Sequence, residues 1–299
     1  MNRLHLMSVF VAVVEEGSLA GGARRMMMSP PAVTRAINAL ESHVGVKMLQ
    51  RTTRYVRVTE AGQRYFEDAR RVIADADAAD EAAAGINAAP RGSLTVTAPV
   101  IFGKMFVMPS IVAYLNRYPD MEVSALFVDR MVNLLDEGVD VAIRIGELPD
   151  SGMKALRVGQ VHRVVVAAPS YLQRAGTPAT PADLNGHVIV AAQTVTGGNE
   201  WKFQARGQAL TVRVKPRVAV SSIDAAIRTV REGFGISCLM SYQVAPYVAS
   251  GELIVLLEAF ETLPFPIHVV HLESRFASTK VRSFVDLVAA RLRGETSLG

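Results

Sequence analysis

The sequence predicts an α/β protein in which an all-α N-terminal module with a short hairpin precedes two α/β subdomains. Three observations support this prediction. Apolar residues recur at helical spacing through the first 45 residues, an alanine-rich stretch without proline covers residues 60–87, and runs rich in valine and isoleucine alternate with helical segments from Ser93 onward. A chain of 299 residues is long enough for two or three domains.

The composition is that of a globular protein. Hydrophobic residues make up 50% and charged residues 20% of the chain, which excludes extensive disorder and a fibrous protein. The single cysteine, Cys238, excludes an intrachain disulfide and a cysteine-based zinc site. Glu15 and Glu16 stand where a signal peptide would be cleaved, and the longest uncharged run, residues 233–251, is interrupted by glycines and a proline. We therefore expect a soluble, cytoplasmic protein with no membrane partner.

The first two helices are predicted by periodicity and punctuation. Apolar residues at helical spacing define a helix that Gly17 ends, and Ser18 is a suitable N-cap for a second helix over residues 19–28. That second helix contains Gly21-Gly22, and each glycine weakens a helix by about 1 kcal/mol relative to alanine. We therefore expect the second helix to depend on tertiary packing.

The third helix has two distinct faces. Ser29 is its predicted N-cap, Pro30 fits the first helical position, and Gly45 closes the helix. The buried stripe is predicted to hold Val33, Ile37, Leu40 and Val44. The side chains that point away from this stripe are Pro31, Thr34, Arg35, Asn38 and Ser42.

Thr, Arg and Asn on a free helix face are the residue types that read bases in the DNA major groove. Arginine forms bidentate hydrogen bonds with guanine, and asparagine forms them with adenine. A hairpin predicted over residues 49–59 adds arginines that suit phosphates or the minor groove. The net charge is +5 over residues 1–72, −3 over 73–91 and +2 over 92–299, so the basic excess also lies in this module. The alternative for each of these features is an ordinary solvated surface.

A long amphipathic helix is predicted over residues 60–87. Its apolar stripe is narrow and keeps a mainly three-and-four spacing, which is typical of a coiled-coil seam between two chains. The alternative is a single helix that lies on its own domain. Residues 88–92, AAPRG, are predicted to break the helix and to serve as a linker.

Valine- and isoleucine-rich strands alternate with helices from Ser93 to the C-terminus. This alternation predicts parallel sheets covered by helices on both faces. About 200 residues are too many for one such sheet, so we expect two α/β subdomains with a cleft between them. Helices are expected at residues 223–232 and 278–292.

The sequence resembles the LysR-type transcriptional regulators of bacteria. The resemblance is carried first by residues 10–62 and continues through AAPRGSLTVTAP, LLDEGVDVAIRIGELPDS and VREGFGISCLMSYQVAPYVASGELI, so it covers almost the whole chain. It is strongest to the subgroup with RTTR in the wing and DEGVDVAIRIG in the effector domain.

The resemblance implies a domain layout and partners. A winged helix-turn-helix DNA-binding domain would occupy residues 1–59, a dimerising linker helix residues 60–89, and an effector domain resembling type 2 periplasmic binding proteins residues 90–299. In the effector domain, subdomain I would comprise about 92–162 and 267–299, and subdomain II about 163–266. The implied partners are double-stranded DNA with a palindromic operator, a small-molecule effector, further copies in a homodimer or homotetramer, and RNA polymerase.

The resemblance also implies site residues. Its DNA-contacting positions match Thr34 and Arg35 on the third helix and Arg51, Thr53 and Arg54 in the wing. Together with the start and the outward face of the third helix, the predicted DNA-binding set is Ser29, Pro30, Pro31, Thr34, Arg35, Asn38, Arg51, Thr53 and Arg54. This chain departs from the family pattern at Pro30, where many members have a glutamine that binds a base, and at Gly21-Gly22, where most have two alanines. The effector-binding set, taken by position in the fold, is Pro99, Val100, Ile101, Asp129, Arg130, Thr194, Thr196, Trp201, Phe203 and Ser222. Alternatively, Trp201 and Phe203 belong to the core and Arg130 pairs with a neighbouring carboxylate.

Nothing in the sequence indicates an enzyme. It contains no G-x-S-x-G elbow, no phosphate-binding G-x-x-x-x-G-K-[ST] and no G-x-G-x-x-G. His268 and His271 are three residues apart in a predicted strand and therefore face opposite sides, and Cys238 is predicted to be a buried small hydrophobe. We expect no metal and no cofactor. Two other classes stay open, a binding protein of the solute-receptor type and an architectural DNA binder without an effector.

Overall fold

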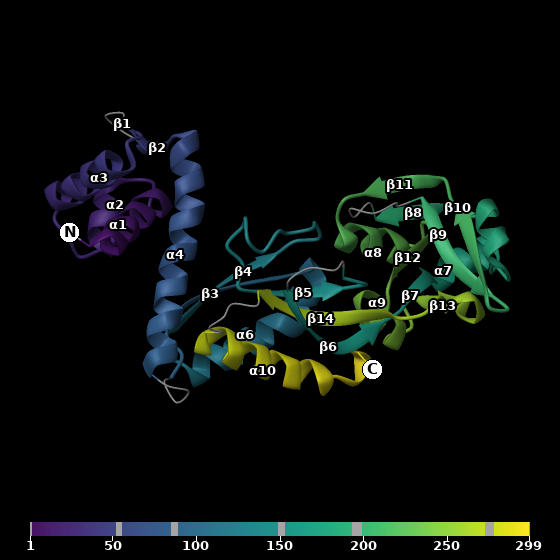
Figure 1. The fold of residues 1–299 in the computed structure, drawn as a ribbon. Helices are drawn as coiled ribbons and strands as arrows, with labels where there is room; N and C mark the ends of the chain where they lie inside the picture. Colours follow the sequence, from purple (N-terminus) through teal and green to yellow (C-terminus); the bar gives the residue numbers. More distant parts are fainter. Residues whose placement is uncertain are drawn as a thin grey trace. The chain divides into compact units, whose positions relative to one another are not determined.

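The computed structural model describes residues 2–51, 56–84, 89–148, 153–192, 199–272 and 278–298 (Figure 1). The chain divides into two compact units. The smaller unit comprises Met1–Ala89, Asn133–Val139 and Ser274–Thr279, and the larger comprises Pro90–Val132, Asp140–Glu273 and Lys280–Gly299. None of the helices among the described residues is long and apolar enough to cross a membrane.

The smaller unit contains the three helices and the hairpin that the sequence predicts. Its elements are α1 (Arg3–Glu15), α2 (Leu19–Arg25), α3 (Pro30–Val44), β1 (Leu49–Arg51), β2 (Val56–Val58) and α4 (Glu60–Ala84). Ser18 caps α2 by accepting a hydrogen bond from the Gly21 N–H at 3.0 Å, as predicted. Ser29 occupies the N-cap position of α3, but the predicted cap bond is absent because its side chain accepts no hydrogen bond there. The second helix is also shorter than predicted, since it ends at Arg25 and Met27 takes a positive φ of 51°.

The second glycine of α2, Gly22, is required by close packing on α1. A Cβ at Gly22 would lie 2.5 Å from Cγ2 of Val13 and 3.0 Å from its Cα, which is closer than real Cβ atoms approach. The core that these helices enclose is built from the apolar faces of α1, α2 and α3 and from the start of the hairpin. Its fully or nearly fully buried members are Leu6, Val9, Phe10, Val13, Ala23, Val33, Ala36, Ile37, Leu40, Met48 and Leu49.

The first turns of α4 pack on this core. Tyr65 meets Phe10 edge to face with ring centroids 5.7 Å apart, and Ala69 is fully buried. Further along the helix Val72, three residues after Ala69 and in the same predicted apolar stripe, is exposed. The alternative of a helix that lies on its own domain therefore holds for the start of α4. At 25 residues and 1.5 Å per residue the helix is about 38 Å long, and pairing with a second chain stays a prediction for the rest of it.

The larger unit contains two five-stranded sheets. One has the order β4-β3-β5-β14-β6, with β3 (Gly92–Ala98), β4 (Met121–Phe127), β5 (Val141–Ile145), β6 (Met153–Val161) and β14 (Phe265–Leu272). The other has the order β11-β8-β12-β7-β13, with β7 (Arg163–Ala167), β8 (Ile189–Ala192), β11 (Pro216–Val220), β12 (Ile236–Met240) and β13 (Ile254–Leu256). A separate hairpin is formed by β9 (Glu200–Ala205) and β10 (Gln208–Arg213).

Helices cover both sheets, as the alternating pattern predicts. Those associated with the first sheet are α5 (Val100–Phe102), η1 (Gly103–Val107), α6 (Met108–Arg117), α10 (Thr279–Arg293) and η4 (Thr296–Leu298). Those associated with the second are α7 (Pro169–Ala175), η2 (Pro181–Gly186), α8 (Ile223–Arg231), α9 (Ser241–Ala249) and η3 (Glu258–Phe260).

The prediction of parallel sheets holds for only part of each sheet, because both sheets are mixed. Strand β3 is parallel to β4 and β5, and β8 is parallel to β11 and β12, but β14 runs antiparallel to β5 and β6, and β7 runs antiparallel to β12 and β13. The physical reason lies in the two crossings between the sheets. The chain passes from β6 into β7 with His162 as the single intervening residue, and it returns from β13 to β14. These crossing strands enter each sheet against the direction of its parallel strands.

Candidate functional site

The first candidate site is the exposed face of α3. Ser29, Pro30, Pro31, Arg35 and Asn38 are exposed, and Thr34 is half-buried. The opposite face of the helix is buried in the core through Val33, Ala36, Ile37 and Leu40. Polar and basic groups thus stand on the side of α3 that its own unit leaves open, which is what a helix in the DNA major groove requires.

The wing is described in part. Strands β1 and β2 pair with Leu49 opposite Val58, and Arg57 on β2 is exposed. Arg51 ends β1, but its side chain is not among those described, and Thr53 and Arg54 lie outside the described residues. The exposed Arg24, at the end of α2, is a further cation of this unit that the sequence reasoning did not select, and the basic last turn of α2 is the signal that marks it.

A buried carboxylate joins α3 to the wing. Glu41 is 4% exposed, and its Oε1 accepts hydrogen bonds from the N–H groups of Met48 at 2.9 Å and Leu49 at 3.1 Å. Its Oε2 accepts from Lys47 Nζ at 2.7 Å. Burial raises the pKa of a carboxyl group, but the hydrogen bonds from Lys47 and the two backbone N–H groups outweigh burial and hold the pKa of Glu41 below its usual value. This contact fixes the end of α3 against the start of β1.

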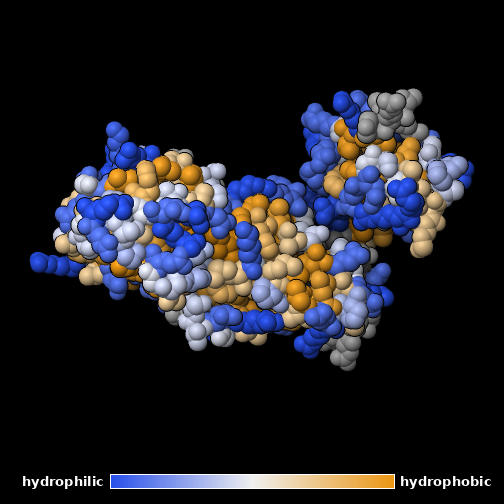
Figure 2. Space-filling model, turned by 180° about the vertical axis from the view of Figure 1, so that it is seen from behind, coloured by the Kyte–Doolittle hydropathy of each residue, from blue (hydrophilic) through white to orange (hydrophobic). Residues whose placement is uncertain are grey.

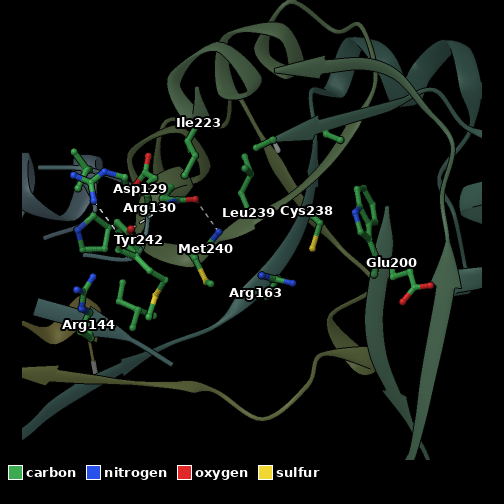
Figure 3. A pocket seen from close by; sticks show the side chains of 18 residues that line it. Asp129, Arg130, Arg144, Arg163, Glu200, Ile223, Cys238, Leu239, Met240 and Tyr242 are labelled. Carbon is green, nitrogen blue, oxygen red and sulfur yellow. Dashed lines mark hydrogen bonds between the residues drawn. The ribbon is translucent and has the colours of Figure 1, made fainter. Parts of the chain in front are cut away.

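The second candidate site is a cavity of about 260 Å³ within the larger unit (Figure 3). It lies between the two sheets, with walls from the loop after β4, the ends of β5, β8 and β12, and the starts of β7, α8 and α9. Four of the residues predicted for effector binding line it, namely Pro99, Asp129, Arg130 and Trp201.

The other predicted effector residues are placed elsewhere. Val100 and Ile101 begin α5 without lining the cavity, although the Val100 N–H donates to Asp129 Oδ1 at 3.0 Å. Phe203 is 4% exposed and belongs to the core, as the alternative interpretation has it. Ser222 caps α8 with its Oγ 3.4 Å from the Ala225 N–H and is not among the lining residues, whereas Ile223 beside it is. Thr194 and Thr196 lie outside the described residues.

Sequence reasoning missed most of the cavity wall. The missed residues are Val128, Met131, Arg144, Ile145, Arg163, Ala191, Ala192, Glu200, Ile223, Cys238, Leu239, Met240, Tyr242 and Gln243. Many of them stand at the carboxyl ends of strands, where ligands bind in open α/β sheets, so the strand ends were the signal that could have found them.

Two ionisable side chains of the cavity wall, Cys238 and Tyr242, are electrically neutral. Burial raises the pKa of the Cys238 thiol to about 12, and the nearby Arg163 lowers it only in part, so the thiol stays protonated at neutral pH. Cys238 packs against the core as predicted but is half-buried and faces the cavity as well. Burial likewise raises the pKa of the Tyr242 hydroxyl, which accepts a hydrogen bond from Gln243 Nε2 at 3.2 Å. Both side chains are therefore hydrogen-bonding groups and not anions.

Comparison with known proteins gives two family matches that together cover most of the chain. Residues 4–63 match the model of the bacterial regulatory helix-turn-helix protein of the lysR family, and residues 87–293 match the model of the LysR substrate binding domain.

Individual relatives and solved structures agree with these matches. The chain is 31% identical over 261 residues to the probable HTH-type transcriptional regulator LtrA of Klebsiella pneumoniae, covering 87% of this chain and 84% of the relative. It is 31% identical over 288 residues to the HTH-type transcriptional regulator CrgA of Neisseria meningitidis serogroup B, covering 96% of each. The solved structure of CrgA, a LysR-type transcriptional regulator, is similar with a TM-score of 0.63 at 30% identity, over 96% of this chain and 98% of that one.

Proposed function

Because this chain belongs to the LysR family of DNA-binding transcriptional regulators with an effector-binding domain, we propose which of its parts carry out each step. Residues 1–59 read DNA, residues 60–89 pair two chains, and residues 90–299 bind the effector and transmit its presence. The protein acts in the cytoplasm on a palindromic operator, with RNA polymerase as a further partner.

The DNA-reading assignment rests on the exposed face of α3. Arg35 and Asn38 are exposed while the opposite side of the helix is fixed in the core, so the helix can enter the major groove without unfolding its own unit. Thr34, Ser29, Pro30 and Pro31 complete this face. Arg51, Arg54 and the exposed Arg57 neutralise phosphates or enter the minor groove beside it, and the hydroxyl of Thr53 donates a hydrogen bond to a phosphate.

The test is a binding titration on the natural operator at several salt concentrations. We expect Arg35→Ala to weaken operator binding and to relax base preference, whereas Arg57→Ala weakens binding to all sequences and lowers the salt slope by about 1. Arg228→Ala, a matched loss of an exposed arginine on α8, serves as the control. If Arg35→Ala leaves both affinity and base preference unchanged, α3 is not the reading helix.

Self-association is supported by an unpartnered apolar surface on the larger unit. Four large hydrophobic side chains are exposed on η1, α6 and the edge strand β4, namely Met105, Met108, Val112 and Leu126. The face of the larger unit turned away from the viewer in Figure 1 carries broad hydrophobic areas (Figure 2). Exposed patches of this kind mark protein–protein contacts. We infer that this surface and α4 hold a homodimer or homotetramer, which light scattering of the full chain would measure.

Effector sensing is assigned to the cavity between the two sheets. Its walls combine apolar side chains with a few convergent polar and charged groups, as in most small-ligand sites. An effector changes operator binding only through different affinities for two arrangements of the protein, so the coupling amounts to about 1–3 kcal/mol.

A cavity-filling substitution tests this assignment. Ala192→Trp places a large side chain at the end of β8 inside the cavity, and Ala192→Ser is the matched control that leaves the space open. We expect the tryptophan variant to bind the operator without effector as the parent does and to lose the effector-dependent change in footprint. A folded tryptophan variant that still responds like the parent would favour an architectural DNA binder or a sensing site elsewhere.

A further inference from the structure

Three guanidinium groups reach the cavity from three different elements. Arg130 follows β4, Arg144 lies in β5 and Arg163 is the first residue of β7 (Figure 3). Arg163 is placed where the chain has just crossed between the sheets, and its Cα pairs with that of Met240 on β12. Two carboxylates, Asp129 and Glu200, also line the cavity.

Both carboxylates are engaged with other groups. Asp129 accepts the Val100 N–H at 3.0 Å, and Glu200 pairs with Arg213 across the β9–β10 hairpin at 2.9 Å. Glu200 lies at the far side of the view in Figure 3, with its carboxylate directed away from the Arg163 side chain. Glu200 is therefore paired with a cation outside the cavity wall, and Asp129 is held at the start of α5.

Arg130 and Arg144 donate hydrogen bonds to the backbone carbonyls of Met131 and Val132, whereas Arg163 lies over an aromatic ring. Among the residues that the structure describes, no carboxylate lies within ion-pair distance of its guanidinium group. Its described partner is the ring of Phe265, whose centroid is 5.5 Å away. Cys238, which lines the cavity and feels the charge of Arg163, is a neutral thiol because burial raises its pKa to about 12. A half-buried cation of this kind is stabilised by an anion that its planar N–H groups can bind in pairs.

Apolar side chains face the same space. Trp201, Leu239 and Ile223 line the cavity beside Arg163, and Trp201 is 5% exposed. The volume of about 260 Å³ lies just below the usual range of small-ligand sites, so it suits a small metabolite better than a peptide or a nucleotide chain.

We propose that the ligand of this cavity is a small organic carboxylate, with its carboxylate on the Arg163 guanidinium and its apolar body against Trp201, Leu239 and Ile223. This inference rests on the proposed effector function of the cavity and names its ligand class. Arg163 is the residue that selects for the negative charge, and the apolar wall selects for the body of the molecule.

The experiment uses matched charged and neutral probes on the full chain. Sodium benzoate and sodium 4-methylpentanoate are compared with benzamide and 4-methylpentanamide by thermal shift and by calorimetric titration. Arg163→Gln removes the cation, Arg163→Lys keeps the charge without the planar pair of donors, and Arg228→Gln removes the same charge from the surface of α8. We expect at least one carboxylate to bind while its amide does not. We also expect Arg163→Gln to lose about tenfold or more in affinity, Arg163→Lys to lose less, and Arg228→Gln to bind as the parent does.

Several outcomes overturn the inference. They are equal binding of an amide and its carboxylate, no binding of any probe carboxylate, or unchanged carboxylate affinity in both Arg163 variants. Failure of the proposed function has a different signature. If a carboxylate binds through Arg163 but the operator footprint is the same with and without it, the ligand class holds and the sensing role of the cavity fails.

Discussion

Removing the Glu41 carboxylate tests whether one buried side chain holds the reading helix to the wing. The two carboxylate oxygens have different partners. Oε1 accepts hydrogen bonds from the backbone N–H groups of Met48 and Leu49, while Oε2 accepts one from the Lys47 ammonium group. Glu41→Ala removes all three contacts. Glu41→Gln keeps a carbonyl oxygen for the two N–H groups and removes the ion pair.

The magnitudes follow from burial. Each backbone N–H left buried without an acceptor costs about 1–3 kcal/mol, so the alanine variant, which leaves two of them, should lose about 2–6 kcal/mol of local stability. Lys47 is 76% exposed, so its ion pair is screened by solvent and contributes about 1 kcal/mol or less. The glutamine variant should therefore lose about 1 kcal/mol, far less than alanine.

The pH dependence has a defined sign. The pKa of Glu41 is lower in the folded state than its ordinary value, so its contribution to the free energy of unfolding is complete above the unfolded pKa and is lost as the pH falls through the folded pKa. The difference between the parent and Glu41→Gln should shrink over that acid range, because the parent side chain becomes neutral as well.

Hydrogen exchange resolves the effect in the full chain. Peptides from residues 33–51 should lose the most protection from exchange in the alanine variant and less in the glutamine variant, both relative to the parent. Peptides around Trp201 in the larger unit should keep their protection and act as the internal control. Operator affinity should be lowest in the alanine variant, intermediate in the glutamine variant and highest in the parent. Equal loss of protection in the alanine and glutamine variants would refute the reasoning, since it would mean that the two N–H groups do not depend on Oε1.

Three further predictions concern packing, base reading and assembly. Gly22→Ala should destabilise the smaller unit by about 1–3 kcal/mol in hydrogen exchange, despite alanine's higher helix propensity, because its Cβ would overlap Val13; a stabilised variant would contradict the packing. Arg35→Ala should cost about 1–3 kcal/mol on the preferred operator in a gel-shift titration and much less on a scrambled one, and equal losses on both would mean a phosphate contact. Met108→Glu should lower the mass measured by light scattering, because it places a charge in the exposed apolar surface. Val112→Ala is the control, since it trims the same surface without adding charge and should keep the parent mass.

The helices of the smaller unit could be predicted from sequence because their signals are local. Periodic apolar residues, Ser18 as a cap and Gly45 as a stop predict α1, α2 and α3 with bounds close to those observed. The reason for Gly22 was not accessible in this way. Helix propensity counts it as a weakness, whereas its function is to let α2 approach the Val13 side chain on α1, and that contact exists only in the folded unit.

The direction of the crossing strands was beyond local reasoning for a similar cause. Strands β7 and β14 are as rich in valine and isoleucine as the parallel strands, because burial on both faces sets their composition regardless of direction. Direction is set by where the chain enters each sheet. The single residue between β6 and β7, His162, marks the first crossing, and the sequence alone does not distinguish such a junction from one long strand.

The cavity shows most plainly why site residues are harder to predict than elements. Arg130, Arg144 and Arg163 lie in separate segments, and each taken alone is an ordinary cation at a strand end. They become a site because two sheets, joined through the His162 crossing, bring the ends of their strands to one space, where three arginines stand beside two acids and one of those acids, Glu200, is paired with Arg213. The excess of positive charge in that space is a property of pairing, which depends on three-dimensional distance. Composition holds no such distances, so the basic excess of residues 1–72 points to the DNA-reading module, while the net charge of +4 over the whole chain gives no sign of the ligand's charge.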